Sequence, residues 1–122
     1  MAANNVTEKI VLSGGAADGT GIKVVATATA GTLIHTGPTT VTEFDELYLY
    51  AQNNHNANVD LTIERGNANT ENNVKVTIPY KQGATFVVPW WILKWNASPL
   101  TVKAFASVAT VITIFGYGHK IN

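Results

Sequence analysis

The stretch NVDLTIE, residues 58–64, alternates apolar and polar side chains along its whole length. Val59, Leu61 and Ile63 occupy every second position, with polar residues between them. Successive side chains of a β-strand point to opposite faces, so this period of two predicts a strand with one buried face and one face in water. Two further stretches repeat the pattern, NVKVTIP at 73–79 and LTVKAFA at 100–106. Most of the apolar residues are β-branched, which favours a pleated surface.

Less regular apolar runs complete a series of short strands. The stretch ELYLYAQ (46–52) is apolar on both faces, which is typical of a central strand or of one covered by a neighbouring chain. No segment keeps helical periodicity over the length of a helix. Short strands separated by turns predict an all-β, single-domain antiparallel β-sandwich of the jelly-roll type. Besides the three alternating stretches, we expect strands near residues 6–12, 22–29, 32–35, 46–52, 84–88, 91–95 and 110–117.

Polar loops and prolines mark the ends of these strands. QNNHNAN (52–58) and RGNANTENN (65–73) contain no large apolar residue and are typical of solvated loops. We expect Pro79, Pro89 and Pro99 at strand ends, where the missing backbone N–H costs least.

The glycine-rich stretch SGGAADGTG (13–21) divides the chain. Its composition predicts a flexible segment that does not pack against a core. We therefore expect an N-terminal arm and linker over residues 1–21 and a β-sandwich body over residues 22–122.

Composition argues against several kinds of partner. Eight Lys and Arg residues balance eight Asp and Glu residues, and Arg65 is the only arginine, so nucleic acid is not an expected partner. The chain has no cysteine, which excludes disulfides and thiolate metal sites. No run of 18 apolar residues predicts a membrane span, and the N-terminus does not resemble a secretory signal. We expect synthesis in the cytoplasm and no membrane partner.

The polar residues show no pattern typical of catalysis. His35, His55 and His119 are 20 and 64 residues apart, which gives no local metal motif. The acidic stretch EFDE (43–46) is expected to cap and solvate the start of a strand rather than to form a glycosidase pair or a calcium loop. Ser13 has no local base partner, and its glycine-rich surroundings lack the lysine and helix of a phosphate-binding loop. We predict no catalytic residue, no metal ligand, no cofactor and no enzymatic activity.

All three tryptophans lie within VVPWWILKWNASPL, residues 87–100. In an extended segment Trp91 and Trp95 share one face, and Trp90 lies on the other. Three exposed indoles would present about 450–750 Å², which reaches or exceeds the largest apolar patch of a typical monomer, about 300–600 Å². We expect the rings to lie partly in the core and partly in a contact between subunits, with Lys94 at its rim. Burial in the core alone and a sugar-binding platform are the alternatives.

Four ordered stretches carry a resemblance to a known class of proteins. They contain matching motifs at Ile34–Thr36, Asp45–Ala51, Leu61–Gly66, Ile78–Pro89 and Val102–Tyr117. The stretches are VVATATAGTLIHT, FDELYLYAQNNHNANVDLTIERG, VTIPYKQGATFVVPWWIL and LTVKAFASVATVITIFGYGHKI. Their order resembles the small capsid decoration, or cement, proteins of tailed bacteriophages. The chain departs from this pattern at Trp90 and Trp91, where smaller residues are expected, and residues 1–21 match nothing in it.

The resemblance implies a jelly-roll homotrimer that sits on the outside of a phage head. Its expected partners are the major capsid protein and two further copies of the chain, and its expected location is the virion surface. The expected subunit interface comprises Tyr48, Tyr50, Trp90, Trp91 and Trp95. The N-terminal arm (2–12) is the candidate for a capsid-binding element, with Asn4, Asn5, Val6 and Lys9 as its candidate contacts.

Two other functions remain open from the sequence. The chain could belong to the tail, neck or fibre of a virion. It could instead be a carbohydrate-binding module that uses Trp90, Trp91 and Trp95 as its platform.

Overall fold

The computed structural model describes residues 7–95 and 97–121, with the backbone alone for Trp90. Within these residues the chain forms nine strands and one short 3₁₀ turn, and the expected scarcity of helix is confirmed. The strands are β1 (Thr7–Val11), β2 (Ile22–Val24), β3 (Thr32–Thr36), β4 (Phe44–Asn53), β5 (Val59–Gly66), β6 (Asn73–Ile78), β7 (Thr85–Lys94), β8 (Thr101–Ala106) and β9 (Ile112–Ile121), and the turn is η1 (Thr70–Asn72).

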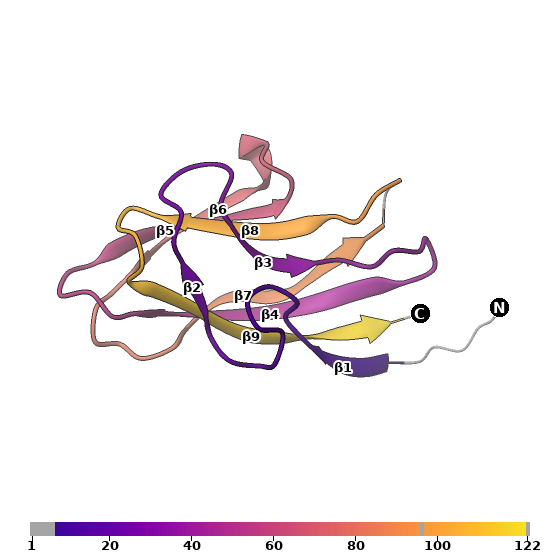
Figure 1. Cartoon of the computed structure of the whole chain (residues 1–122), viewed down its shortest axis with the longest axis horizontal. Helices are drawn as coiled ribbons and strands as arrows, with labels where there is room; N and C mark the ends of the chain where they lie inside the picture. The colour runs from indigo at the N-terminus through magenta and orange to yellow at the C-terminus, as the bar shows by residue number, and fades with distance from the viewer. Residues whose placement is uncertain (1–6, 96, 122) are drawn as a thin grey trace.

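The strands form two antiparallel sheets that pack face to face, as Figure 1 shows. Sheet A has the order β1-β9-β4-β7, and β2 pairs with a further part of β9. Sheet B has the order β3-β8-β5-β6. The predicted all-β antiparallel sandwich is confirmed, whereas its jelly-roll type stays a prediction.

The core lies between the two sheets and is almost entirely aliphatic. From β5, Val59, Leu61 and Ile63 point into it and are completely buried, which confirms the alternation predicted for this strand. Leu47 and Leu49 of β4 face them from sheet A and are also completely buried. The remaining large members of the core are Leu12, Ile22, Val24, Ile34, Ile78, Val88, Leu93, Val102, Ile112 and Ile114.

The outer side of β5 is less exposed than its polar sequence predicts. Thr62 and Glu64 are both buried, although alternation places them on the face expected to be in water. The Glu64 carboxylate accepts hydrogen bonds of 2.7 Å from the Thr29 hydroxyl and from the Gly31 amide. These bonds satisfy the buried charge, so the loop between β2 and β3 can cover this end of sheet B.

The tryptophan-rich segment forms one strand instead of the two that we expect near 84–88 and 91–95. Pro89 lies inside β7, whereas Pro79 and Pro99 lie outside the strands as predicted. Leu47 pairs with Trp91 and Leu49 with Val88, so β7 carries an extra residue around Pro89. This bulge and the position of β7 at the edge of sheet A explain how a strand accommodates a proline that cannot donate a ladder hydrogen bond.

The sandwich includes residues 7–14, which the expected division of the chain assigns to the arm and linker rather than to the body. Strand β1 pairs with β9 along its whole length, and Leu12 is only 5% exposed in the core. The Gly14 amide donates a hydrogen bond of 2.9 Å to the Ile34 carbonyl. Residues 15–21 then form an exposed turn that leads to β2. Backbone pairing thus incorporates residues 7–14 of the expected arm and linker into the body.

A buried polar cluster joins the two sheets at the start of β4. Asp45 was expected to be solvated, but only 1% of it is exposed, and its Oδ2 lies 2.8 Å from Nε2 of the buried His35 on β3. Asp45 Oδ1 accepts no hydrogen bond from the described residues, and Lys120 Nζ lies 3.5 Å from it as a compensating charge. The histidine and the lysine are far from Asp45 in sequence, so the acidic stretch itself gives no sign of this burial.

We predict that Asp45→Ala lowers the free energy of unfolding by about 2–4 kcal/mol, because it leaves a buried imidazole without its partner. Urea unfolding monitored by far-UV circular dichroism measures this change. Glu71→Ala is the control, since Glu71 is an exposed carboxylate on η1 and its loss should change stability by less than about 0.5 kcal/mol. Equal stability of the two variants would contradict a structural role for the Asp45–His35 pair.

Candidate functional site

The outer side of sheet A carries a continuous group of aromatic side chains, which we call the aromatic face. The antiparallel register explains this grouping, because Tyr48 lies opposite Tyr117, and Tyr50 lies opposite both Phe86 and Phe115. Residues directly opposite in neighbouring strands point to the same side of a sheet. The aromatic face comprises Tyr48, Tyr50, Phe86, Phe115, Tyr117 and His119.

The rings of the aromatic face contact one another across the strands. Tyr48 and Tyr117 stack with their ring centroids 5.1 Å apart and 16° between their planes. Tyr50 and Phe86 are 4.8 Å apart and tilted by 33°. His119 lies edge-on to both tyrosines of the first pair, at 5.7 Å from each. Such contacts fix the rings in place, so the face is preorganised.

Glycines in β9 allow this close packing. A Cβ atom at Gly116 would clash with the backbone carbonyl oxygen of Tyr48, and one at Gly118 would lie 2.8 Å from Leu47 Cδ2. A larger residue at either position would push β9 away from β4. The alternation of aromatic residues and glycines in ITIFGYGHKI therefore keeps the two strands close enough for Tyr48 and Tyr117 to stack.

One carboxylate lies among these rings. The Tyr48 hydroxyl donates a hydrogen bond of 2.9 Å to Oε1 of Glu46, and Nδ1 of His119 lies 3.4 Å from the same oxygen. The hydrogen bond to Glu46 raises the pKa of Tyr48 above its usual value, and desolvation and the negative charge of Glu46 act in the same direction. The aromatic face thus combines apolar surface with one anchored acidic group.

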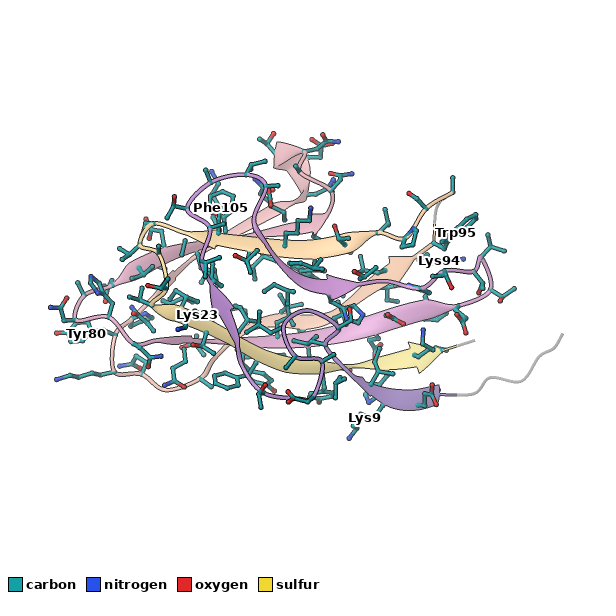
Figure 2. All side chains as sticks on the ribbon, in the orientation of Figure 1. Lys9, Lys23, Tyr80, Lys94, Trp95 and Phe105 are labelled. Carbon is teal, nitrogen blue, oxygen red and sulfur yellow. The ribbon has the colours of Figure 1, made fainter. Side chains whose placement is uncertain are left out.

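Tyr48 and Tyr50, two of the residues predicted at a subunit interface, lie together on the aromatic face. Trp91 points to the other side of sheet A, where it is partly buried and packs against the core. The guanidinium carbon of Arg65 lies 4.9 Å from the centre of its ring. Trp95 is half-buried beyond the end of β7 (Figure 2), and the side chain of Trp90 lies outside the described residues. The predicted interface set is therefore divided between two sides of the sheet.

The predicted capsid-binding residues are also separated by the structure. Asn4, Asn5 and Val6 lie outside the described residues. Lys9 belongs to β1 and is exposed at the edge of sheet A, as Figure 2 shows, where its Nζ lies 5.4 Å from the centre of the Tyr117 ring. Lys9 therefore borders the aromatic face and is not part of a free arm.

The fold brings Ser13 to a histidine that the sequence does not place beside it. The Ser13 amide donates a hydrogen bond of 3.1 Å to Nδ1 of His35, so the imidazole carries its proton on Nε2, which faces Asp45. The Ser13 hydroxyl lies 3.3 Å from the same Nδ1 and accepts a hydrogen bond of 2.8 Å from the Thr36 amide. In a catalytic triad the imidazole lone pair must be available for the serine hydroxyl. Here the backbone N–H of Ser13 already donates a hydrogen bond to that lone pair, so this contact joins the segment after β1 to β3 as a structural contact.

Sequence reasoning missed Phe86, Phe115, Tyr117 and His119 as members of the aromatic face. The signal was present in β9, where Phe115, Tyr117 and His119 alternate with glycines at a period of two. The partner strand was not readable from the sequence, because β9 pairs with β4 across about 70 residues of chain. Only this pairing shows that these residues extend the surface that contains Tyr48 and Tyr50.

Comparison with known proteins adds no further assignment. No protein-family model, no curated protein and no solved structure matches the chain. Within residues 7–95 and 97–121, no helix is long and apolar enough to cross a membrane. The same part of the chain holds no group of three or more His, Asp or Glu side chains that could bind a metal ion. The structure defines an all-β sandwich whose most distinctive surface is the aromatic face.

We predict that Glu46→Gln lowers the pKa of Tyr48 toward its usual value, because the variant removes the negative charge that opposes ionisation of the phenol. NMR titration of the tyrosine ring carbons, with Tyr48 assigned through a Tyr48→Phe sample, measures this pKa. Glu71→Gln is the matched control and should leave the titration unchanged. An unaltered Tyr48 titration in Glu46→Gln would contradict the proposed influence of the Glu46 carboxylate on Tyr48.

Proposed function

We propose that this chain is a non-enzymatic structural protein of a phage virion, a capsid decoration or cement protein that binds the outside of the head as a homotrimer. The observation that carries the proposal is the aromatic face, which contains Tyr48 and Tyr50 of the predicted subunit interface. The ordered motifs that resemble decoration proteins support the same conclusion, as does a sandwich fold. A jelly-roll arrangement of the two sheets is part of this proposal.

The side chains around the aromatic face favour contact with another protein surface. Phe86, Ile92 and Val11 remain 47%, 45% and 45% exposed, although all three are apolar and lie on sheet A. Burying apolar surface contributes about 25 cal/mol per Å². Aromatic residues are enriched in the centres of protein interfaces, where lysine is depleted. The position of Lys9 and Lys94 at opposite edges of sheet A fits the rim of such a contact.

A trimer placed on the capsid lattice would stabilise the shell by mass action. A protein that binds only the assembled shell lowers the free energy of the shell, by an amount that grows with the concentration of the binding protein. Three linked copies engage the lattice together, so the second and third contacts form at high effective concentration. In this proposal the aromatic face joins the copies, and the N-terminal residues that precede β1 contact the major capsid protein.

The structure gives less support to a carbohydrate-binding module built on the tryptophans. A sugar platform needs ring faces that are open to solvent. Trp91 instead packs against the core on one side and lies beneath the Arg65 guanidinium. This geometry favours a structural role for Trp91.

We predict that sedimentation equilibrium of the purified protein gives a molar mass three times that of one chain. The double variant Phe86→Ser, Ile92→Ser should shift this equilibrium from trimer toward monomer. Both substitutions remove exposed apolar side chains from sheet A without changing the core. Leu33→Ser is the control, because Leu33 is 39% exposed on the outer side of sheet B and its loss should leave the trimer intact. A wild-type chain that stays monomeric at tens of micromolar would contradict the proposed trimer.

The location of the chain in a virion tests the decoration role itself. We predict that antibodies against the recombinant protein label the heads of intact particles, and that density for the sandwich lies on the outer capsid surface in a reconstruction. Labelling confined to the tail, neck or fibres would overturn decoration and favour the other virion role. A reconstruction that places the chain on the head but as single copies would retain decoration and reject the trimer.

A further inference from the structure

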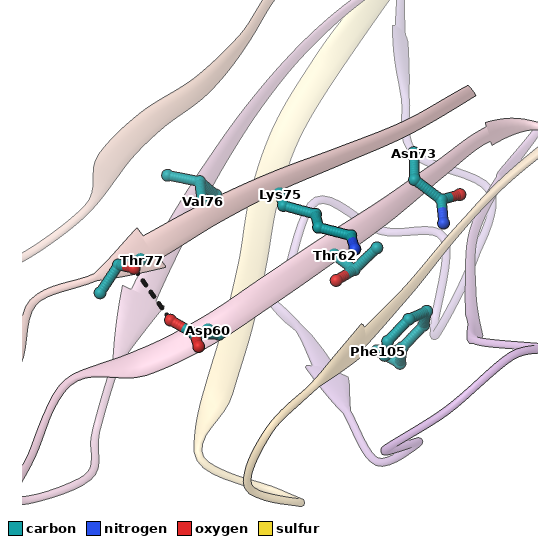
Figure 3. A pocket seen from close by; sticks show the side chains of 7 residues that line it. All are labelled: Asp60, Thr62, Asn73, Lys75, Val76, Thr77 and Phe105. Atoms are coloured by element: carbon teal, nitrogen blue, oxygen red, sulfur yellow. Dashed lines mark hydrogen bonds between the residues drawn. The ribbon is translucent and has the colours of Figure 1, made fainter. Parts of the chain in front are cut away.

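A second surface feature lies on the opposite side of the sandwich from the aromatic face. The outer side of sheet B contains a groove with a volume of about 440 Å³. This volume lies within the range of small-molecule sites in proteins, about 300–1,000 Å³. The groove is lined by Asp60, Thr62, Asn73, Lys75, Val76, Thr77 and Phe105, which Figure 3 shows.

The register of three strands builds the centre of this groove. Thr62 of β5 lies opposite Lys75 of β6 on one side and opposite Phe105 of β8 on the other. The Phe105 ring and the Lys75 side chain therefore flank Thr62, as Figure 3 shows. The buried Thr62 forms the floor, because its short side chain leaves room between two longer neighbours.

Hydrogen bonds hold one end of the groove, and a buried amide lies at the other. At one end, Asp60 Oδ1 accepts a hydrogen bond of 2.8 Å from the Thr77 hydroxyl, and the Asp60 amide donates one of 3.0 Å to the Ser107 hydroxyl oxygen. At the other end, Asn73 lies opposite Glu64, and the buried Oδ1 of Asn73 accepts no hydrogen bond from the described residues. The lining residues of the groove all belong to the strands β5, β6 and β8.

The chemistry of the lining distinguishes between classes of ligand. One carboxylate, one ammonium group, an amide and two hydroxyls offer both donors and acceptors, and the charges of Asp60 and Lys75 cancel. A phosphate or sulfate would meet Asp60 as a like charge, and a strongly apolar ligand would leave these groups unpaired. A neutral sugar has many hydroxyl groups and also an apolar face of C–H groups that packs against an aromatic ring. Phe105 supplies the ring, and the polar residues supply the hydrogen bonds.

We propose that the groove on sheet B binds one or two units of a neutral glycan, with Phe105 against the apolar face of a sugar ring. Asp60 accepts hydrogen bonds from its hydroxyl groups, and Asn73 and Lys75 donate to its oxygens. This site does not use the tryptophans, and it is independent of the proposed virion role because it lies on the other sheet from the aromatic face.

NMR titration of the full chain with neutral disaccharides tests this proposal. The probes are maltose, cellobiose, lactose and N,N′-diacetylchitobiose, each added at millimolar concentration to a ¹⁵N-labelled sample. We expect at least one of them to shift the amide signals of Thr62, Asn73, Lys75 and Phe105 in a saturable manner. No saturable shift with any probe, or shifts confined to sheet A, would overturn the proposal. Sodium sulfate that shifts the same signals at lower concentration than every sugar would also overturn it in favour of an anion site.

Matched variants separate binding from folding. Phe105→Ala should raise the dissociation constant of the bound disaccharide by about tenfold or more, because it removes the ring contact. Tyr80→Ala removes an exposed aromatic side chain that lies outside both the groove and the aromatic face, and it should leave this constant unchanged. Lys75→Met keeps the length of an exposed side chain but removes its ammonium donor, so it should weaken disaccharide binding without unfolding the protein. Lys23→Met makes the same change at an exposed position of sheet A and is the control. Unchanged binding in both Phe105→Ala and Lys75→Met would rule out the groove as the site.

Discussion

Packing between two sets of aliphatic side chains determines how the rest of this molecule is arranged. Leu47 and Leu49 of sheet A and Leu61 and Ile63 of sheet B are completely buried between the sheets. Each such side chain contributes about 1.5–3 kcal/mol relative to exposure. Because the side chains of a strand alternate, this inward packing also fixes which residues point outward. A shift of one residue in register would move the core residues into solvent, so the packing that stabilises the sandwich also defines its two outer surfaces.

The two outer surfaces differ because their strands contribute different residues at the outward positions. On sheet A the outward positions of β4 and β9 are mostly aromatic, and they stack in cross-strand pairs such as Tyr48 with Tyr117. On sheet B the outward positions of β5 and β6 are mostly polar, and Thr62 lies between Lys75 and Phe105. A preorganised aromatic surface favours contact with another protein, whereas a polar groove with a single ring favours a small hydroxylated ligand.

Sequence patterns predicted the features that depend on neighbouring residues in the chain. The alternation in NVDLTIE correctly identified the buried face of β5, and the prolines at 79 and 99 correctly marked strand ends. Features that depend on partners distant in sequence were missed. Asp45 was expected to be solvated because its neighbours in the sequence, Glu43 and Glu46, are acidic. Its actual partners are distant in the chain: His35 comes from β3, and Lys120, which compensates its charge, comes from β9. Glu64 was misplaced for the same reason, since the loop that covers it lies more than 30 residues away. Of the six residues of the aromatic face, only Tyr48 and Tyr50 were predicted at a contact surface, because β9 supplies residues such as Tyr117 through a pairing that its own sequence does not reveal.

The buried polar cluster explains why the N-terminal strand belongs to the body. Ser13 contacts His35 through both its amide and its hydroxyl, and His35 in turn contacts Asp45 at the start of β4. Residues immediately after β1 are therefore fastened to both sheets, since β3 belongs to sheet B and β4 to sheet A. With β1 also paired to β9 at the edge of sheet A, residues 7–14 are held in the body by backbone ladders as well as by these side-chain contacts.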